Sequence, residues 1–139
     1  MWRYALSYPI FAVIFGLFDA VWLSTAFGRV YQPALGPLLA ERLRLGAAAL
    51  FYLVYVAGVT VFVLAPAVGA GDWRQAALRG AMFGFFAYAT YDLTNQATLK
   101  AWSTRLSVID MGWGTLATGL AAALTVLAAH RAARALGWA

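Results

Sequence analysis

The sequence predicts an all-α integral membrane protein, a bundle of four transmembrane helices with a short interfacial helix in its first loop. Hydrophobic residues make up 64% of the 139 residues, and charged residues only 11%. A soluble domain of this size usually carries about a quarter charged residues and leaves much of its surface in water. Lipid is therefore the expected solvent for this surface.

Four segments are long and apolar enough to span a bilayer, and together they form one domain over residues 1–139. They cover about residues 5–27, 46–64, 78–99 and 108–129. The first joining segment contains Pro37, and proline is favoured in the first turn of a helix, so the interfacial helix is expected over residues 37–44. A second loop is expected over residues 66–74 and a third around residues 100–105, where proline, glycine and charged residues occur.

With four spans, both termini and the second loop share one side of the membrane. Five basic residues fall on that side and five on the other, so the count alone does not set the orientation by the positive-inside rule. Arg131 and Arg134 lie directly at the end of the last span, where the rule weighs charge most. They favour cytoplasmic termini.

Composition excludes several kinds of site. The chain has no cysteine and a single histidine, His130, which excludes disulfides, thiolate catalysis, cysteine-ligated metals and a bis-histidine haem within one chain. No nucleotide-binding loop, Ser-His-Asp set or zinc spacing occurs, so no cofactor and no metal is expected. The net charge of +5 is expected to meet anionic lipid headgroups and not nucleic acid.

Three of the five acidic residues, Asp19, Asp92 and Asp110, fall in or at the edge of the expected spans. A charge at mid-membrane costs at least about 2.5 to 3.5 kcal/mol, so such residues are rarely incidental. Asp19 and Asp92 each follow the start of their span by 14 residues, about 21 Å of helix. Their two spans run in the same direction, and Asp110 opens the fourth span from the far side. All three carboxylates are therefore expected near one leaflet.

These three aspartates are the candidate acid–base residues, because carboxylates held close together share protons. They could equally hold a cation, and the spacing does not decide between these roles. Polar and aromatic residues three positions further along the chain lie on the same helix face. With their neighbours they give the expected binding residues Asn95, Tyr91, Thr94, Trp22, Trp113, Lys100 and Tyr55.

The same residues could instead have purely structural roles. Polar side chains that bond across helices contribute about 0.6 kcal/mol each, and Asp110 at a helix start could serve only as a cap. The Asp-x-x-Trp pattern occurs in the first and fourth spans, which run in opposite directions, and this hints at an inverted internal repeat. Close helix packing is predicted for the small residues Gly80, Gly84, Gly112, Gly114 and Gly119.

Three motifs carry a resemblance to a known family. They are Tyr91-Asp92-Leu93-Thr94-Asn95 in the third span, Asp110-x-x-Trp113-Gly114 in the fourth and Asp19-x-x-Trp22 in the first. Over nearly its whole length the sequence resembles the DUF2177 family of predicted bacterial membrane proteins. The resemblance implies a multi-pass protein of the bacterial inner membrane. It also implies lipid chemistry or lipid handling, because such proteins are encoded near lipid-modifying enzymes of the cyclopropane-synthase type.

Three functions are consistent with these observations. The first is an enzyme or binding protein for a lipid or another lipophilic small molecule, with membrane lipids as its partners. The second is a small transporter or ion-conducting subunit, which would have to form a homo-oligomer because four helices are few for a pathway. The third is an accessory subunit of another membrane protein, in which the aspartates are structural.

Overall fold

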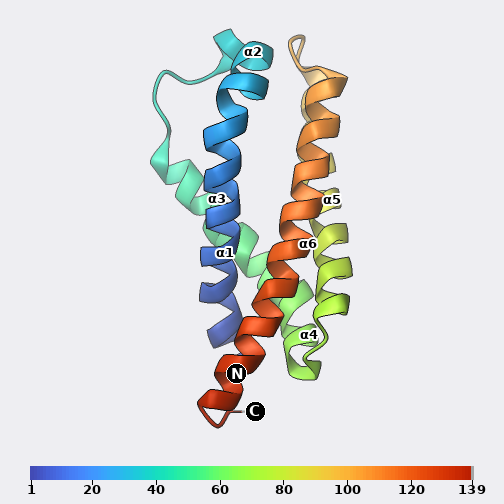
Figure 1. Cartoon of the computed structure of the whole chain (residues 1–139). Coiled ribbons are helices and arrows are strands. Elements are labelled where there is room, and N and C mark those ends of the chain that lie inside the picture. Colours follow the sequence, from blue (N-terminus) through green and yellow to red (C-terminus); the bar gives the residue numbers. More distant parts are fainter. Residues whose placement is uncertain (139) are drawn as a thin grey trace.

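The computed structural model describes residues 1–138, and within them every regular element is a helix (Figure 1). The first helical segment runs through α1 (Trp2–Ala26), the π-helical turn η1 (Phe27–Tyr31), α2 (Gln32–Leu35) and the 3-10 turn η2 (Gly36–Leu38). The second comprises α3 (Leu45–Val59), the π-helical turn η3 (Thr60–Leu64) and α4 (Ala65–Ala70). The last two are α5 (Trp73–Thr98) and α6 (Thr104–Ala135). The predicted all-α class is confirmed.

The four helical segments lie side by side as an antiparallel bundle (Figure 1). Both termini and the turn between α4 and α5 lie at one end, whereas α2 and the loop between α5 and α6 lie at the other. Consequently α1 and α5 run in one direction, and α3 and α6 run in the other.

Three stretches of the described residues are long and apolar enough to cross a membrane: Trp2–Leu38, Leu45–Ala70 and Thr104–Ala135. The remaining long helix, α5, has 26 residues but is not among them. Arg74, Arg79 and Asp92, together with its amide side chains, lower its hydropathy. The chain thus has three candidate spans, and α5 is the segment on which a fourth depends.

Two of the loop predictions are wrong. The helix expected over residues 37–44 is reduced to the turn η2, and residues 39–44 are not helical. Gly36 lies outside the α region (φ 3°, ψ −85°), which is disfavoured for a residue that precedes proline, and glycine tolerates the unusual conformation that it adopts. The loop expected from residue 66 begins later, because Pro66 lies in the first turn of α4, where its missing N–H is tolerated.

α5 and α6 form the most extensive helix pair of the bundle, and glycines bring their backbones together. A Cβ placed on Gly80 would lie 2.9 Å from a backbone oxygen of α6, and one on Gly84 would clash with the carbonyl oxygen of Gly114. Gly119 is similarly close to the backbone of α5. The predicted packing role is confirmed for these four glycines. It is wrong for Gly112, where a Cβ would meet nothing within 4 Å.

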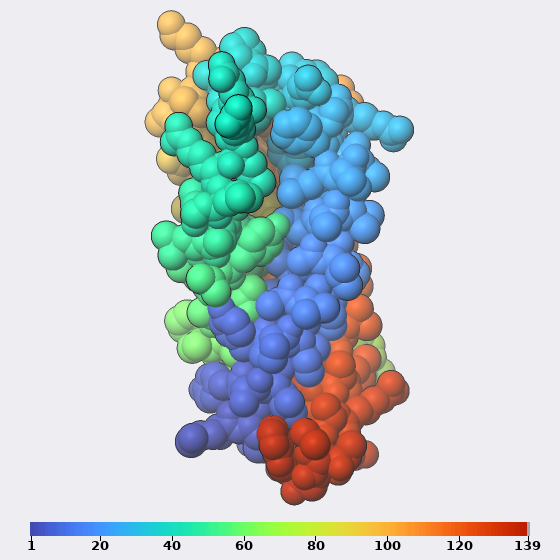
Figure 2. Space-filling view, turned by 90° about the vertical axis from the view of Figure 1, so that its left-hand side faces the viewer, coloured from blue at the N-terminus to red at the C-terminus, as the bar shows by residue number. Residues whose placement is uncertain are grey.

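The first half of α3 differs from the rest of the bundle because it has no buried side chain between residues 45 and 54. The main core lies further along, around Phe11, Phe15, Val59 and Leu64, where α1, η3 and α6 meet. Figure 1 shows the start of α3 leaning away from the other helices, and Figure 2 shows it in turquoise beside the blue α1. This loosely packed stretch forms one wall of the candidate site.

Candidate functional site

A cavity of about 500 Å³ lies between α1, α3, α5 and α6, toward the end of the bundle that holds α2. Its volume falls in the range of small-molecule sites, about 300 to 1,000 Å³. The lining combines two carboxyl groups with a majority of aromatic side chains. It consists of Asp19, Trp22, Leu23, Tyr31, Phe51, Tyr55, Ala87, Tyr88, Tyr91, Asp110 and Trp113.

Asp19 is held by donors from two other helices. The hydroxyl of Tyr52 on α3 donates to Asp19 Oδ2, and the indole N–H of Trp113 on α6 lies 3.4 Å from Asp19 Oδ1. The side chain is only 8% exposed. Both carboxylate oxygens are therefore directed by neutral donors, and the contact with Tyr52 connects the loosely packed α3 to α1.

Asp110 is held in a similar way from the end of the first helical segment. The Tyr31 hydroxyl donates to Asp110 Oδ1, and Trp22 Nε1 donates in turn to the Tyr31 hydroxyl at 2.9 Å. Residues nine apart lie on opposite faces of an uninterrupted α-helix, at 100° per residue. The π-helical turn η1 changes this phase just before Tyr31, so that Tyr31 and Trp22 meet on the side of α6.

The two Asp-x-x-Trp motifs meet across the bundle. The indole rings of Trp22 and Trp113 stack with their centroids 4.6 Å apart and their planes 6° from parallel. Each tryptophan is linked by hydrogen bonds to the aspartate of the other helix. The Trp113 indole donates to Asp19, and the Trp22 indole donates to the Tyr31 hydroxyl, which donates to Asp110. The antiparallel α1 and α6 thus place their motifs in a reciprocal arrangement.

Asp92 lies behind the cavity and not in its lining. It is fully buried, and neither of its carboxylate oxygens has a hydrogen-bond partner among the described residues. Asp110 and Trp102 are its neighbours, but the Trp102 indole donates to Ser107 at 3.1 Å. Asp110 lies within Coulombic range of both Asp19 and Asp92. The structure therefore gathers the three carboxylates at one end of the bundle but exposes only two of them to the cavity.

The expected binding residues divide into two groups. The cavity is lined by Trp22, Trp113, Tyr55 and Tyr91, and the Tyr55 hydroxyl is fixed by a 2.7 Å hydrogen bond to Thr118. The other group, Asn95, Thr94 and Lys100, does not reach it. The reason is height along the chain: these residues follow Tyr91, which lines the cavity, by about one helical turn or more and therefore lie past its edge. Thr94 and Lys100 are exposed.

Neither Tyr31 nor Tyr52 is among the site residues expected from the sequence, although both donate to the cavity carboxylates. Tyr31 falls outside every span boundary in the sequence, because it follows the apolar segment and precedes Pro33. The hydrophobic periodicity of the sequence does not identify Tyr31 as a site residue. The π-helical turn η1 directs its side chain toward Asp110 on α6. Tyr52 lies within the second expected span, but its hydrogen bond to Asp19 could not be predicted from the sequence.

The cavity carries acid–base groups but no metal cluster. Within residues 1–138 no group of three or more His, Cys, Asp or Glu side chains could hold a metal ion. Two buried carboxyl groups with tyrosine hydroxyls as donors can hold or move protons, or can face a cation. The aromatic walls provide ring faces for an apolar or cationic group.

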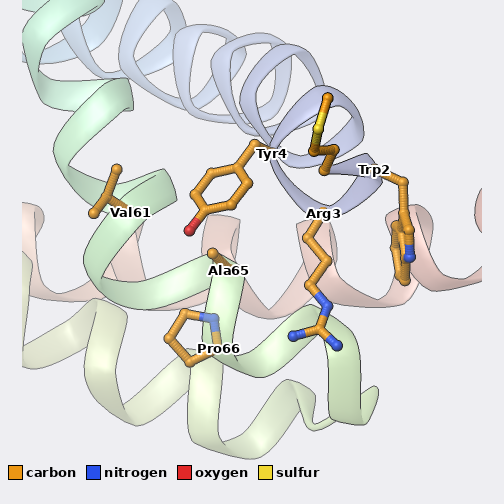
Figure 3. A pocket seen from close by; sticks show the side chains of 7 residues that line it. Trp2, Arg3, Tyr4, Val61, Ala65 and Pro66 are labelled. Atoms are coloured by element: carbon orange, nitrogen blue, oxygen red, sulfur yellow. The ribbon is translucent and has the colours of Figure 1, made fainter.

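A second cavity, of about 470 Å³, lies at the opposite end of the bundle near the chain terminus (Figure 3). Its lining includes Trp2, Tyr4 and Pro66, and its one charged side chain is Arg3. The guanidinium of Arg3 packs directly over Gly69 of α4. Its basic character contrasts with the acidic cavity at the other end.

Comparison with known families gives a match over nearly the whole chain. The family model described as "Predicted membrane protein (DUF2177)" covers residues 4–127, which include Asp19, Asp92, Asp110 and both Asp-x-x-Trp motifs. The match confirms the resemblance indicated by those motifs. No curated protein and no solved structure matches the chain.

Proposed function

Because the chain belongs to the DUF2177 family of predicted membrane proteins, we propose that it binds a lipophilic molecule within the membrane, in the cavity between α1, α3, α5 and α6. The observation that carries this proposal is the cavity itself. Its volume suits a small organic ligand, its walls are mostly aromatic, and its two carboxyl groups give it polar recognition points.

The membrane arrangement that fits this function has α5 as a fourth span. α5 packs along α6, which is a candidate span, and its 26 residues reach about 39 Å at 1.5 Å per residue. Its fully buried Asp92 is shielded from lipid. The proposed location is the bacterial plasma membrane, with both termini cytoplasmic.

Single cysteines test this topology cleanly, because the chain has none of its own. Asp72→Cys lies in the α4–α5 turn and Ala101→Cys in the α5–α6 loop, and a fourth span places them on opposite sides. An impermeant maleimide added to intact cells should label Ala101→Cys alone. Labelling of both positions from one side contradicts the fourth span.

The proposed binding is tested by filling the cavity. Ala87→Phe adds a ring within the lining, whereas Ala97→Phe adds the same ring at an exposed position of the same helix, outside the lining. Native mass spectrometry of the protein released from non-ionic detergent should show a bound lipophilic molecule in the wild type and in Ala97→Phe. Occupancy should fall about fivefold or more in Ala87→Phe, because the added ring occupies part of the ligand volume. A wild-type protein without any bound lipophile contradicts the proposal.

Catalysis on the bound molecule is the second candidate function. It is favoured by Asp19 and Asp110 facing the same cavity with tyrosine hydroxyls on both, an arrangement that can donate and accept protons. Asp110→Asn should then leave ligand occupancy measurable but alter the lipid composition of cells that express it. A composition identical to that of wild-type cells, with occupancy retained, limits the function to binding.

A further inference from the structure

The charge of the cavity lining has a single sign. Asp19 and Asp110 are its charged residues, and no Lys, Arg or His contributes to it. Both side chains are more than nine-tenths buried, with 8% and 5% exposed. Taking a carboxylate out of water costs several kcal/mol unless a positive charge accompanies it. The cavity therefore favours a ligand that brings that charge.

The hydrogen bonds in the site orient the carboxylates without neutralising them. Tyr52, Trp113 and Tyr31 are neutral donors. Among the described residues no hydrogen bond reaches Oδ2 of Asp110, although Oδ1 accepts from Tyr31. The site thus presents acceptor capacity and negative charge that the protein itself does not match.

The surrounding rings favour an organic cation over an inorganic one. The faces of tryptophan and tyrosine attract cations within about 6 Å, and such contacts are strongest where water is excluded. Stacking uses one face of Trp22 and one of Trp113, which leaves the outer faces of the pair. A metal ion would need a tight set of oxygen ligands, whereas this cavity of about 500 Å³ is mostly lined by rings.

The opening of the cavity indicates what is attached to the cation. Leu23 on α1 and Phe51 on α3 belong to the lining and are each 43% exposed. Phe51 belongs to the part of α3 that buries no side chain, so we expect this side of the cavity to be open to lipid. An alkyl chain attached to a ligand in the cavity can leave between them into the bilayer.

We propose that the ligand is an amphiphile with a cationic nitrogen headgroup, which lies between Asp19 and Asp110 against the stacked tryptophans while its chain passes Leu23 and Phe51. This inference rests on the proposed function, since it specifies the ligand class for the same cavity. It also gives the two Asp-x-x-Trp motifs a common role, in which each motif supplies one carboxylate and one ring.

The test compares single-chain probes that share a hexadecyl tail and differ in headgroup: trimethylammonium, glucoside and sulfate. Binding to the full chain in non-ionic detergent is measured by native mass spectrometry at probe concentrations below micelle formation. The trimethylammonium probe should bind about tenfold more tightly than the glucoside, and the sulfate should bind most weakly. Asp110→Asn should reduce the preference for the cationic probe to about twofold. Glu41→Gln, the same change of charge in an exposed loop residue outside the lining, should leave it unchanged.

The outcomes separate this inference from the function on which it rests. Equal binding of all three probes overturns the cationic headgroup but leaves lipophile binding intact. Binding of none, together with an empty wild-type protein, overturns both. Suppression of the cationic probe by millimolar sodium chloride, but not by an equal concentration of choline chloride, identifies a small inorganic cation as the occupant and also overturns the amphiphile. The ranking in the wild type decides the question even if Asp110→Asn does not fold.

Discussion

The α5–α6 pair and the first half of α3 differ in how closely they pack against the rest of the bundle. α5 and α6 approach so closely that glycine hydrogens fill the contact, with Gly84 against the Gly114 carbonyl oxygen. α3 buries no side chain between residues 45 and 54, and its Tyr52 hydroxyl reaches Asp19 at the edge of the cavity. Lipid tails are as apolar as leucine, so helices gain little from apolar burial alone and depend on close fit and hydrogen bonds.

We call the closely packed α5–α6 pair the scaffold and residues 45–54 of α3 the wall, because the first is held by backbone contact and the second is loosely packed. The scaffold holds Asp110, Trp113 and Tyr88 in place, because Tyr88 packs directly on Gly114. The wall, residues 45–54 of α3, contributes Phe51 to the lining, and its Tyr52 hydroxyl attaches it to Asp19 on α1. If the cavity binds a ligand as proposed, we expect entry by displacement of α3 and not by disruption of the helix pair.

The largest expected effect comes from breaking the scaffold. Gly84→Ala places a methyl group against the backbone of α6 and should lower the free energy of unfolding by about 3 kcal/mol, at the upper end for overpacking. Gly112→Ala is the matched control, because its Cβ would meet nothing within 4 Å. Denaturation by sodium dodecyl sulfate in mixed micelles, followed by circular dichroism, measures both. Equal losses in the two variants would contradict the packing described for α5 and α6.

A smaller effect should separate the two halves of α3. Val59→Ala removes methyl groups from a fully buried side chain and should cost about 1 to 2 kcal/mol in the same assay. Val54→Ala, five residues earlier and 63% exposed, should change stability by less than about 0.5 kcal/mol. A comparable loss at Val54 would show that the first half of α3 is packed in the membrane, for example by a second copy of the chain.

The smallest effect should have the opposite sign and concerns a buried carboxyl group of the scaffold without a hydrogen-bond partner in the described part of the chain. Asp92 is fully buried with neither oxygen partnered, so Asp92→Leu removes an unsatisfied polar group and should raise stability by about 1 kcal/mol. Thr94→Leu, an exposed change on the same helix, should have almost no effect. Destabilisation by Asp92→Leu would mean that this carboxyl group has a stabilising partner within the bundle.

Local pattern in the sequence was enough to predict the long helices. Three candidate spans follow from apolar length, because a bilayer fixes how many residues a crossing needs, whereas the fourth span stays a prediction and the helix expected over residues 37–44 is wrong. Equal counts along the parallel first and third segments place Asp19 and Asp92 at equal heights, and Asp110 comes to the same end because its helix starts from there. Gly80, Gly84 and Gly114 were likewise identified as packing residues from spacing alone.

Features that depend on rotation about a helix axis, or on contacts between distant segments, needed the tertiary structure. The π-helical turn η1 brings Tyr31 over Asp110, and a turn of α5 places Asp92 behind the cavity instead of in it. The height of a residue along a helix is found by counting residues at about 1.5 Å each, so it can be read from the sequence. The direction in which a side chain points changes by 100° with each residue, so one irregular turn or one tilted helix reassigns it. For this reason the sequence itself determined which residues share a level in the membrane, and only the packed structure decided which of them face the same cavity.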